Sequence, residues 1–190
     1  MLNKKEFESI RKDLEQFEKK REELIKLSRD IIHNSKEIIY SLQRGDEAGA
    51  KKHIPNIQKL IKSMPKDSYD TGMASVAIQE YVEALMFYHV MEDKKLPTRK
   101  DIEVDTNSYL LGLCDVTVEL LRRAIKAVID KDYQLFNELK KLVNEIWHQI
   151  LFLELRNGEL RKKSDQVKYA VNRLEEVEYD LHVKGIRHVD

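Results

Sequence analysis

Four acidic side chains on two segments with helical periodicity are the residues best placed to do chemistry. Glu80 and Glu83 lie three residues apart in AIQEYVEALMFYH, and Asp115 and Glu119 lie four apart in YLLGLCDVTVELLRRAIKAVI. Each spacing stacks two carboxylates on one face of a helix, where like charges destabilise an isolated helix by roughly 0.2–0.5 kcal/mol. The pair of Asp115 and Glu119 therefore requires compensation, either by a basic partner or by a bound cation. Glu80 and Glu83 interrupt an apolar stripe, so a carboxylate buried there must be paired, protonated or bound to a metal.

The two acidic pairs are expected to face each other. Their helices follow one another after a short connection, which predicts antiparallel neighbours. Four converging carboxylates cannot all stay ionised without cations, and oxygen ligands favour magnesium, manganese or calcium over zinc. One or two Mg2+ ions held there could activate water and stabilise a phosphoryl group in transfer. One alternative places Glu80 and Glu83 at the edge of an apolar stripe, in contact with water or an arginine. Another pairs Glu119 with Arg122 or Arg123 on the surface.

The segment 109–129 carries the second acidic pair on a helix with an apolar face. The residues of that face recur at alternating spacings of three and four: Leu111, Cys114, Val118, Leu121, Ile125 and Val128. Gly112 lies one turn ahead of Asp115 on the neighbouring row. A glycine inside a helix costs about 1 kcal/mol relative to alanine, so we expect another helix to approach closely at Gly112.

Composition indicates an all-α protein with one domain across residues 1–190. Charged residues make up 36% of the chain, with only three prolines and six glycines, which is typical of long exposed helices. Lys plus Arg and Asp plus Glu both number 34, so no global field favours or excludes nucleic acid. Cys114 is the only cysteine, no signal-peptide pattern begins the sequence, and no apolar run of about 18 residues occurs. These features predict a soluble, cytoplasmic protein without a membrane segment.

Periodicity, prolines and glycines predict six long helices and one short one, a seven-helix bundle without strands. The expected ranges are residues 4–44, 47–64, 67–93, 98–104, 105–130, 132–156 and 159–184. Pro55 is expected to kink the second helix or to delay its start. The last helix carries a heptad seam, which serves either as intramolecular core or as a subunit interface. The seam residues are Leu160, Val167, Leu174 and Leu181.

Two basic groups are candidates for contacting nucleic acid. Arg29 and Lys36 lie two turns apart in the first helix and form either a phosphate-contacting row or a solvated face. Arg161, Lys162 and Lys163 begin the last helix, where their charge opposes the helix dipole. An unfavourable placement of this kind indicates a function such as RNA contact, with plain solvation as the alternative.

Several segments resemble the translin and translin-associated factor X superfamily. KLSRDIIHNSK from Lys26, QEYVEALMFYH from Gln79 and YLLGLCDVTVELLRRAI from Tyr109 are similar to the factor-X side. LRKKSDQVKYAVNRLEEVEYDLHVKG from Leu160 is similar to translin itself. The resemblance covers most of the chain up to Gly185, with the motifs in the same order.

The resemblance implies a seven-helix α fold, assembly into a hollow octamer and magnesium-dependent endonuclease action on RNA. In the family, the nuclease subunit carries acids in the segments that match QEYVEA and DVTVEL here. These acids correspond to the same four that spacing selects: Glu80, Glu83, Asp115 and Glu119. Val118 departs from the family pattern, which usually has glycine at this position. Segments of both kinds in one chain predict a homo-oligomer, expected to be an octamer, in which one subunit is scaffold and nuclease, as in a prokaryotic or archaeal member.

Three functions of different classes remain open. The first is a Mg2+-dependent endoribonuclease, with Mn2+ as an alternative cofactor, that acts on single-stranded or short RNA. The second is a non-catalytic oligomer of translin type that binds single-stranded RNA or DNA. The third is a helical scaffold, for which exposed charges and heptad seams suffice. The four acids favour the nuclease, because a pure binder has no reason to keep carboxylates that repel phosphates.

Overall fold

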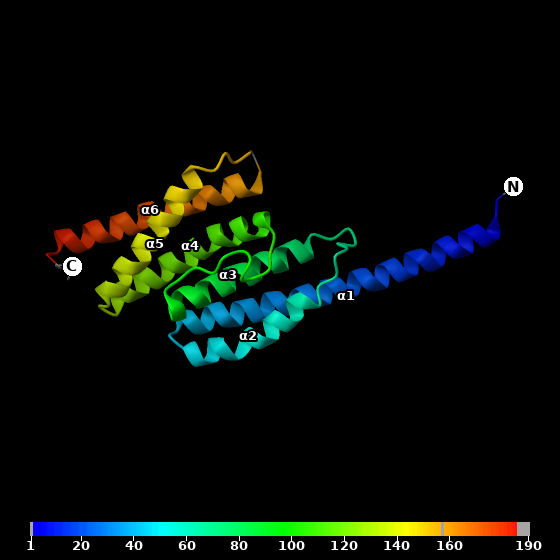
Figure 1. Ribbon diagram of the computed structural model, residues 1–190, viewed down its shortest axis with the longest axis horizontal. Coiled ribbons are helices and arrows are strands. Elements are labelled where there is room, and N and C mark those ends of the chain that lie inside the picture. Colours follow the sequence, from blue (N-terminus) through cyan, green and yellow to red (C-terminus); the bar gives the residue numbers. More distant parts are fainter. Residues whose placement is uncertain (1, 157, 186–190) are drawn as a thin grey trace.

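The computed structural model describes residues 2–156 and 158–185, which form six α-helices and no strand. The helices are α1 (Lys4–Gln43), α2 (Glu47–Lys62), α3 (Met73–Asp93), α4 (Thr106–Ile129), α5 (Tyr133–Leu151) and α6 (Glu159–Val183). Figure 1 shows an elongated bundle with α3 and α4 in the middle, α1 and α2 on one side, and α5 and α6 on the other. The all-α fold class is confirmed. None of the described helices is long and apolar enough to cross a membrane.

The two central helices are enclosed because each is apolar on more than one side. α3 packs against α1, α2 and α4, and α4 packs against α3, α5 and α6. Their buried side chains include Val82, Leu85, Phe87, Leu111, Val116 and Leu120. A helix covered on several sides leaves few positions for charged residues. Glu80 and Glu83 on α3 and Asp115 and Glu119 on α4 therefore lie where the charged form of a side chain is costly.

The expected short helix at residues 98–104 does not form, so the predicted count of seven helices is wrong by one. Asp101 folds its carboxylate back onto Thr98 and accepts hydrogen bonds from the Thr98 amide at 2.7 Å and from its hydroxyl at 2.8 Å. Such local bonds compete with helix formation. Glu103 then adopts a left-handed conformation with a φ of 54°, which a helix cannot continue through.

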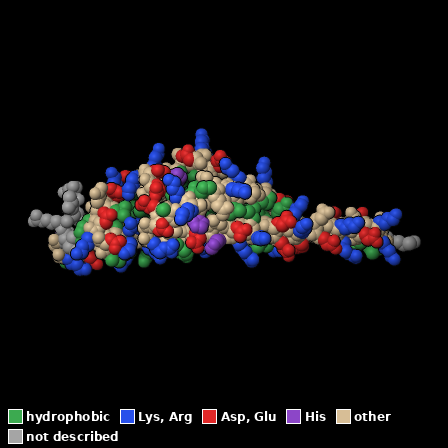
Figure 2. All heavy atoms as spheres, turned by 90° about the horizontal axis from the view of Figure 1, so that it is seen from below, with side chains coloured by type: hydrophobic (Ala, Val, Ile, Leu, Met, Phe, Trp, Pro, Cys, Tyr) green, Lys and Arg blue, Asp and Glu red, His purple; other side chains and the backbone are tan. Residues whose placement is uncertain are grey.

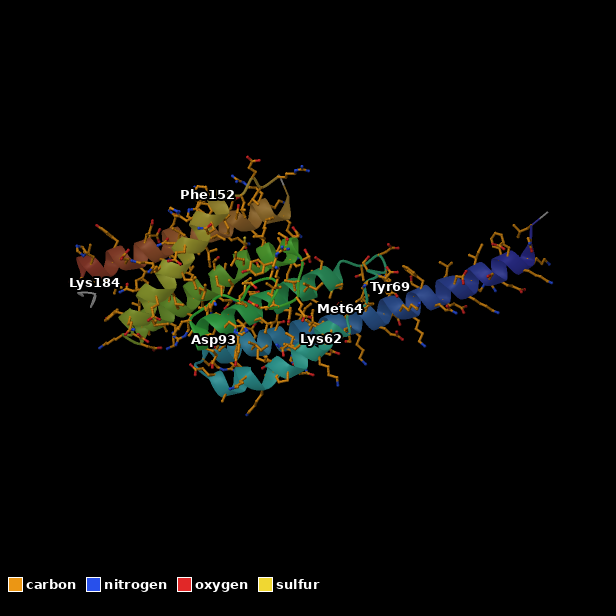
Figure 3. All side chains as sticks on the ribbon, viewed as in Figure 1. Lys62, Met64, Tyr69, Asp93, Phe152 and Lys184 are labelled. Carbon is orange, nitrogen blue, oxygen red and sulfur yellow. The ribbon has the colours of Figure 1, made fainter. Side chains whose placement is uncertain are left out.

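Turns also shorten α3 at its N-terminal end. The helix begins at Met73 rather than at 67, because Tyr69 and Asp70 have positive φ values of 45° and 53°. The Tyr69 ring packs edge-on against Phe17 of α1, with the ring centroids 5.7 Å apart. Figure 3 labels Tyr69 in this loop, beside the part of α1 that leaves the bundle. At the other end of the chain, α5 stops at Leu151 rather than at 156.

Pro55 does not delay the start of α2. The helix begins at Glu47, where the side chain of Asp46 accepts a hydrogen bond from the Gly49 amide at 2.8 Å. This cap stabilises the first turn. Pro55 lies on the exposed side of α2, so the carbonyl that loses its helical partner can be solvated.

α3 and α4 are neighbours, as expected, but they run parallel rather than antiparallel. Both run from right to left in Figure 1, because the connection 94–105 returns along the bundle before α4 begins. The hydroxyl of Tyr109 fixes this return by donating a hydrogen bond to the carbonyl of Pro97 at 3.0 Å, and Ile102 is buried within it. The prediction failed because the connection is long enough to cross the bundle.

The heptad seam of α6 belongs to the core of the single chain. Val167, Leu174 and Leu181 are buried, and Leu160 packs partly buried against the same core. The seam therefore cannot serve at the same time as a free subunit interface. Of the two roles that the sequence left open, the structure supports the intramolecular one.

An apolar stripe is exposed at the other end of the molecule. α1 projects beyond the bundle at its N-terminal end (Figure 1), and Phe7, Ile10 and Leu14 on this arm are exposed. Figure 2 shows basic and acidic side chains interspersed along the arm and over the rest of the face in view. The visible surface thus carries no large region of a single charge.

Gly112 is the point of closest approach between α3 and α4, as its place in the sequence predicts. A Cβ atom added there would lie 2.5 Å from Cγ1 and 2.7 Å from Cβ of Val82, and 3.2 Å from the amide nitrogen of Glu83. These contacts are with a stiff β-branched side chain and with backbone, so neither can give way easily. The glycine lets the two helices pack close enough to bring Glu83 beside Asp115.

We expect Gly112→Ala to lower the free energy of unfolding by about 1–3 kcal/mol, because the added methyl overpacks the contact with Val82. The change is measured by urea denaturation. Gly72→Ala, at the N-cap of α3, is a control for an added methyl without a clash, since a Cβ at Gly72 meets nothing within 4 Å. Equal stability of the two variants would contradict the close approach.

Candidate functional site

Four carboxylates share one partly buried region between α3 and α4. The pKa of Glu83 is raised from 4.5 to about 8, first by burial and then by the charges of Asp115, Glu80 and Glu119, in that order. Burial likewise raises the pKa of Glu80, against the opposing charges of Lys36 and Lys163. Within the described residues, neither Glu80 nor Glu83 has a hydrogen-bond partner for its carboxylate. The structure therefore gathers the four acids that the sequence selected.

Asp115 is paired with Lys163, which the sequence assigned to a basic surface cluster. The Lys163 ammonium donates hydrogen bonds to both carboxylate oxygens, at 2.6 Å and 2.5 Å. The two side chains are only 18% and 19% exposed. Burial raises the pKa of Asp115, and the hydrogen bond and charge of Lys163 oppose that rise. Lys163 thus lies inside the acidic region rather than on the surface with Arg161 and Lys162.

Glu119 is held mainly by Gln43 at the C-terminal end of α1. The Gln43 side chain donates to the Glu119 carboxylate at 2.8 Å and to the Glu119 carbonyl at 2.9 Å. The guanidinium of Arg122 also lies 3.8 Å from the same carboxylate. The ion pair between Glu119 and Arg122 that the sequence offered as an alternative therefore forms, beside the hydrogen bonds from Gln43. Nothing in the local sequence pattern identified Gln43, because it lies on a distant helix.

Basic residues lie around the acids at different distances. Lys36 on α1 is exposed, and its charge lowers the pKa of Glu80 against the effect of burial. Arg29 is exposed earlier on the same helix, and Arg161 and Lys162 are exposed at the start of α6. None of these four forms an ion pair within the described part of the chain. They are free to contact an anion, and Lys36 is the one beside the carboxylates.

A groove between α1 and α4 adjoins the acidic region. Gln43 and Arg122, which both contact Glu119, also line the groove. Its lining residues are Tyr40, Gln43, Arg44, Arg122, Ile125, Lys126 and Ile129. Lys126 forms an ion pair with Asp130, whereas Arg44 has no acidic partner within the described residues. The groove offers positive charge next to negative charge, a feature that the sequence analysis missed because its two sides come from distant segments.

Val118 and Cys114 mark the two sides of α4. Cys114 is buried, and burial raises the pKa of its thiol to about 12, which confirms its role as a small apolar core residue. Val118 is 41% exposed, so its expected place on the buried stripe is wrong. α4 is covered by α3 on one side and by α5 and α6 on the other. The side that carries Val118 and Glu119 is the one left partly open.

The donor set suits a hard divalent cation, but the arrangement in this structure does not form a ligand shell. Carboxylate oxygens are the ligands that Mg2+, Mn2+ and Ca2+ prefer. Among the described residues, no group of three or more His, Cys, Asp or Glu is arranged so that it could hold a metal ion. Lys163 takes both oxygens of Asp115, and Gln43 takes one oxygen of Glu119. Side-chain rearrangement is required before three acids can share an ion.

The fold and the site together define an all-α bundle with a carboxylate cluster between its two central helices. The chain belongs to the Translin family, whose model matches residues 19–185. Translin of Gallus gallus is 27% identical over 157 residues, which cover 72% of this chain and 69% of that protein.

Solved structures share the same fold. A crystal structure of apo-NeC3PO superposes with a TM-score of 0.84 at 28% identity, covering 93% of this chain and 96% of that one. A structure of AfC3PO in complex with duplex RNA superposes with a TM-score of 0.83 at 24% identity, covering 96% and 100% of the two chains.

We expect Glu83→Gln to remove a pH dependence of stability. Because the pKa of Glu83 is raised to about 8, the folded protein holds this proton more tightly than the unfolded chain. The free energy of unfolding should therefore fall as pH rises from about 4.5 to about 8, by about 2–4 kcal/mol. Glu83→Gln should flatten that fall in metal-free buffer and make the protein more stable than the parent at pH 8.

The measurement is urea denaturation at several pH values in the presence of EDTA. Glu92→Gln is the control, because Glu92 is exposed on the same helix and has no ion pair within the described residues. If the free energy of unfolding depends on pH in the same way in the parent and in Glu83→Gln, the hypothesis of a buried, mutually repelling cluster is wrong.

Proposed function

We propose that the protein is a Mg2+-dependent endoribonuclease that acts on single-stranded or short RNA, with Mn2+ as an alternative cofactor. The observation that carries the proposal is the convergence of four carboxylates between the central helices. These acids also occupy the positions that match the nuclease motifs of the translin-associated factor X side of the family. Membership of the Translin family supports nucleic acid as the partner.

Each part of the site has a role in this proposal. Glu80, Glu83, Asp115 and Glu119 supply the oxygens that hold the cation. The cation, when bound, lowers the pKa of a water molecule and offsets charge on the phosphate. Gln43 orients Glu119 through its two hydrogen bonds. Lys36 attracts the phosphate toward the acids without competing for them, because it stays exposed and forms no ion pair within the described residues.

RNA binding is proposed along the basic groove beside the acids. The Coulomb attraction of Lys and Arg for phosphates supplies most of the affinity for nucleic acid, and the groove offers Arg44, Arg122 and Lys126. Lys36 and Arg29 extend the positive charge along α1. AfC3PO, which shares the fold, was solved with duplex RNA. Short RNA and single-stranded DNA are both compatible with contacts of this kind, since they address the phosphate backbone.

A non-catalytic binder of translin type is the second candidate. It is favoured by one observation: in this structure the acids are engaged by Lys163 and Gln43 rather than arranged as ligands of an ion. In this alternative the lysine neutralises Asp115 permanently, and the acids have a structural role. Cleavage assays separate the two candidates.

The catalytic prediction is that Glu80→Ala and Asp115→Ala each lower RNA cleavage at least about 100-fold, as the loss of one electrostatic group in an active site typically does. RNA affinity should stay equal or rise, because a carboxylate that repels phosphates is removed. The assay uses labelled single-stranded RNA with Mg2+ or with EDTA, and the oligomer is checked on the same samples. Glu92→Ala, on the exposed side of α3, is the matched control.

The outcomes of this assay are distinct. Cutting that depends on Mg2+ and on Glu80 and Asp115 supports the nuclease. Binding without cutting by the parent protein supports the translin-type binder. Variants that cut at the parent rate would show that the acids are not catalytic, and variants that lose activity only with the oligomer would assign them a structural role.

The binding prediction concerns the groove. Arg44→Gln should weaken RNA binding a few-fold at about 0.1 M salt and make the plot of log affinity against log salt shallower by about 0.7–0.9, the amount of one phosphate contact. Fluorescence anisotropy at several salt concentrations measures both effects. Lys51→Gln on the exposed face of α2 is the control for net charge. Equal slopes for the two variants would place the RNA elsewhere.

The assembly prediction is a homo-oligomer larger than a dimer, expected to be an octamer that encloses the acidic sites. Exposed apolar side chains support it: Phe7, Ile10 and Leu14 on α1, and Phe152, which is 77% exposed at the end of α5 (Figure 3). Patches of this kind on a folded chain mark interaction sites. Light scattering at micromolar concentration should report the oligomer, and a monomer would contradict this prediction.

A further inference from the structure

In the basic cluster Arg161, Lys162 and Lys163 at the start of α6, Lys163 is the residue whose side chain points toward the acidic region. Its ammonium contacts both oxygens of Asp115, and its charge also acts on Glu80 and Glu83. Arg161 and Lys162, the two residues before it, are exposed. A single tethered cation therefore interacts with three of the four acids.

The position of Lys163 is fixed by the packing of α6 against α4. Ser164, which follows it, is buried and donates a hydrogen bond to the Arg161 carbonyl at 2.6 Å. Val167, one turn later, is fully buried. The helix is thus anchored by residues beside the lysine, so the docking of α6 does not depend on the ion pair, and the ammonium is held where it meets Asp115.

A divalent ion and the lysine ammonium compete for the position between the two oxygens of Asp115. An ion bound to a carboxylate sits about 2.0–2.6 Å from its oxygens, and the ammonium already lies 2.6 Å and 2.5 Å from the two oxygens of Asp115. Two cations that close together repel each other strongly in a partly buried site. An ion that takes the position between the two oxygens of Asp115 must therefore displace the lysine.

We propose that Lys163 is a built-in competitor that occupies the cation position in the metal-free protein and sets the affinity of the acidic cluster for divalent ions. The lysine stabilises the cluster without metal and is displaced when the ion binds. This inference rests on the proposed function, since it takes the four acids as the cation site. It adds a residue that tunes cation affinity from outside the ligand set.

The test is a titration of the purified protein with Mn2+ alone. Binding is measured by calorimetry or by the electron paramagnetic resonance signal of free Mn2+. Lys163→Met keeps the aliphatic length of the side chain and removes its charge. It should bind Mn2+ at least about tenfold more tightly than the parent protein. Lys163→Gln, which keeps a hydrogen-bond donor, is the second neutral variant should Lys163→Met fold poorly. Circular dichroism and light scattering verify fold and assembly.

Two control variants separate the effect of the position of Lys163 from the effect of its positive charge. Lys162→Met removes the same charge one residue earlier, where the side chain is exposed, and should leave Mn2+ affinity within about twofold of the parent. Lys163→Arg keeps the charge and can hold both oxygens of Asp115, so it should bind Mn2+ no more tightly than the parent.

The outcomes separate this inference from the proposed function. If the parent and the neutral Lys163 variants bind Mn2+ equally, or if the variants bind more weakly, the competitor role is overturned while the cation site stands. If neither the parent nor any variant binds Mn2+, the cation site itself is wrong and the competitor role falls with it. Tighter binding by both neutral variants and unchanged binding by Lys162→Met supports the inference.

Discussion

Repulsion among four carboxylates, held together by a close helix contact, is the constraint on which this structure depends. Gly112 lets α4 approach α3 at Val82, and this approach brings Asp115 on α4 next to Glu83. Partly buried like charges cannot be relieved by solvent alone. The remaining helices must therefore supply compensating groups, and the arrangement of the bundle can be understood as the way in which they do so.

The outer helices provide this compensation from opposite sides. α6 contributes Lys163, which pairs with Asp115, and α1 contributes Gln43 and Lys36, which act on Glu119 and Glu80. Glu83 receives no direct partner within the described residues, and burial accordingly raises its pKa to about 8. The compensation is thus incomplete at the centre of the cluster. Groups with raised pKa values of this kind cluster at functional sites, although structural networks also produce them.

The sequence predicted those features of the site that depend on local periodicity. Spacing alone selected the four acids and the close approach at Gly112, because residues one turn apart on a helix share a face whatever the rest of the chain does. The sequence analysis missed Gln43 and assigned Lys163 to a basic cluster rather than to Asp115, since each lies on a helix far from its acidic partner in the chain. The parallel course of α4 escaped it for the same reason: the path of the connection 94–105 depends on contacts of Tyr109 and Ile102 that no local pattern reveals. The sequence analysis placed Val118 wrongly on the buried face. α4 is covered on two sides, and the apolar row that contains Val118 extends onto the side of the helix that is left open.

The open side of α4 explains how a cluster of acids can serve a polyanion. Val118 and Glu119 face the partly open side of this helix, and the groove that adjoins Glu119 is lined by Arg44 and Arg122. In the proposed enzyme, phosphates along a strand would be held by these rim cations. A single phosphate would then enter the acidic region, where a bound divalent ion would offset the negative charge of the acids. In the proposed enzyme, RNA affinity and cleavage would accordingly depend on different residues: affinity on the rim cations, cleavage on the acids.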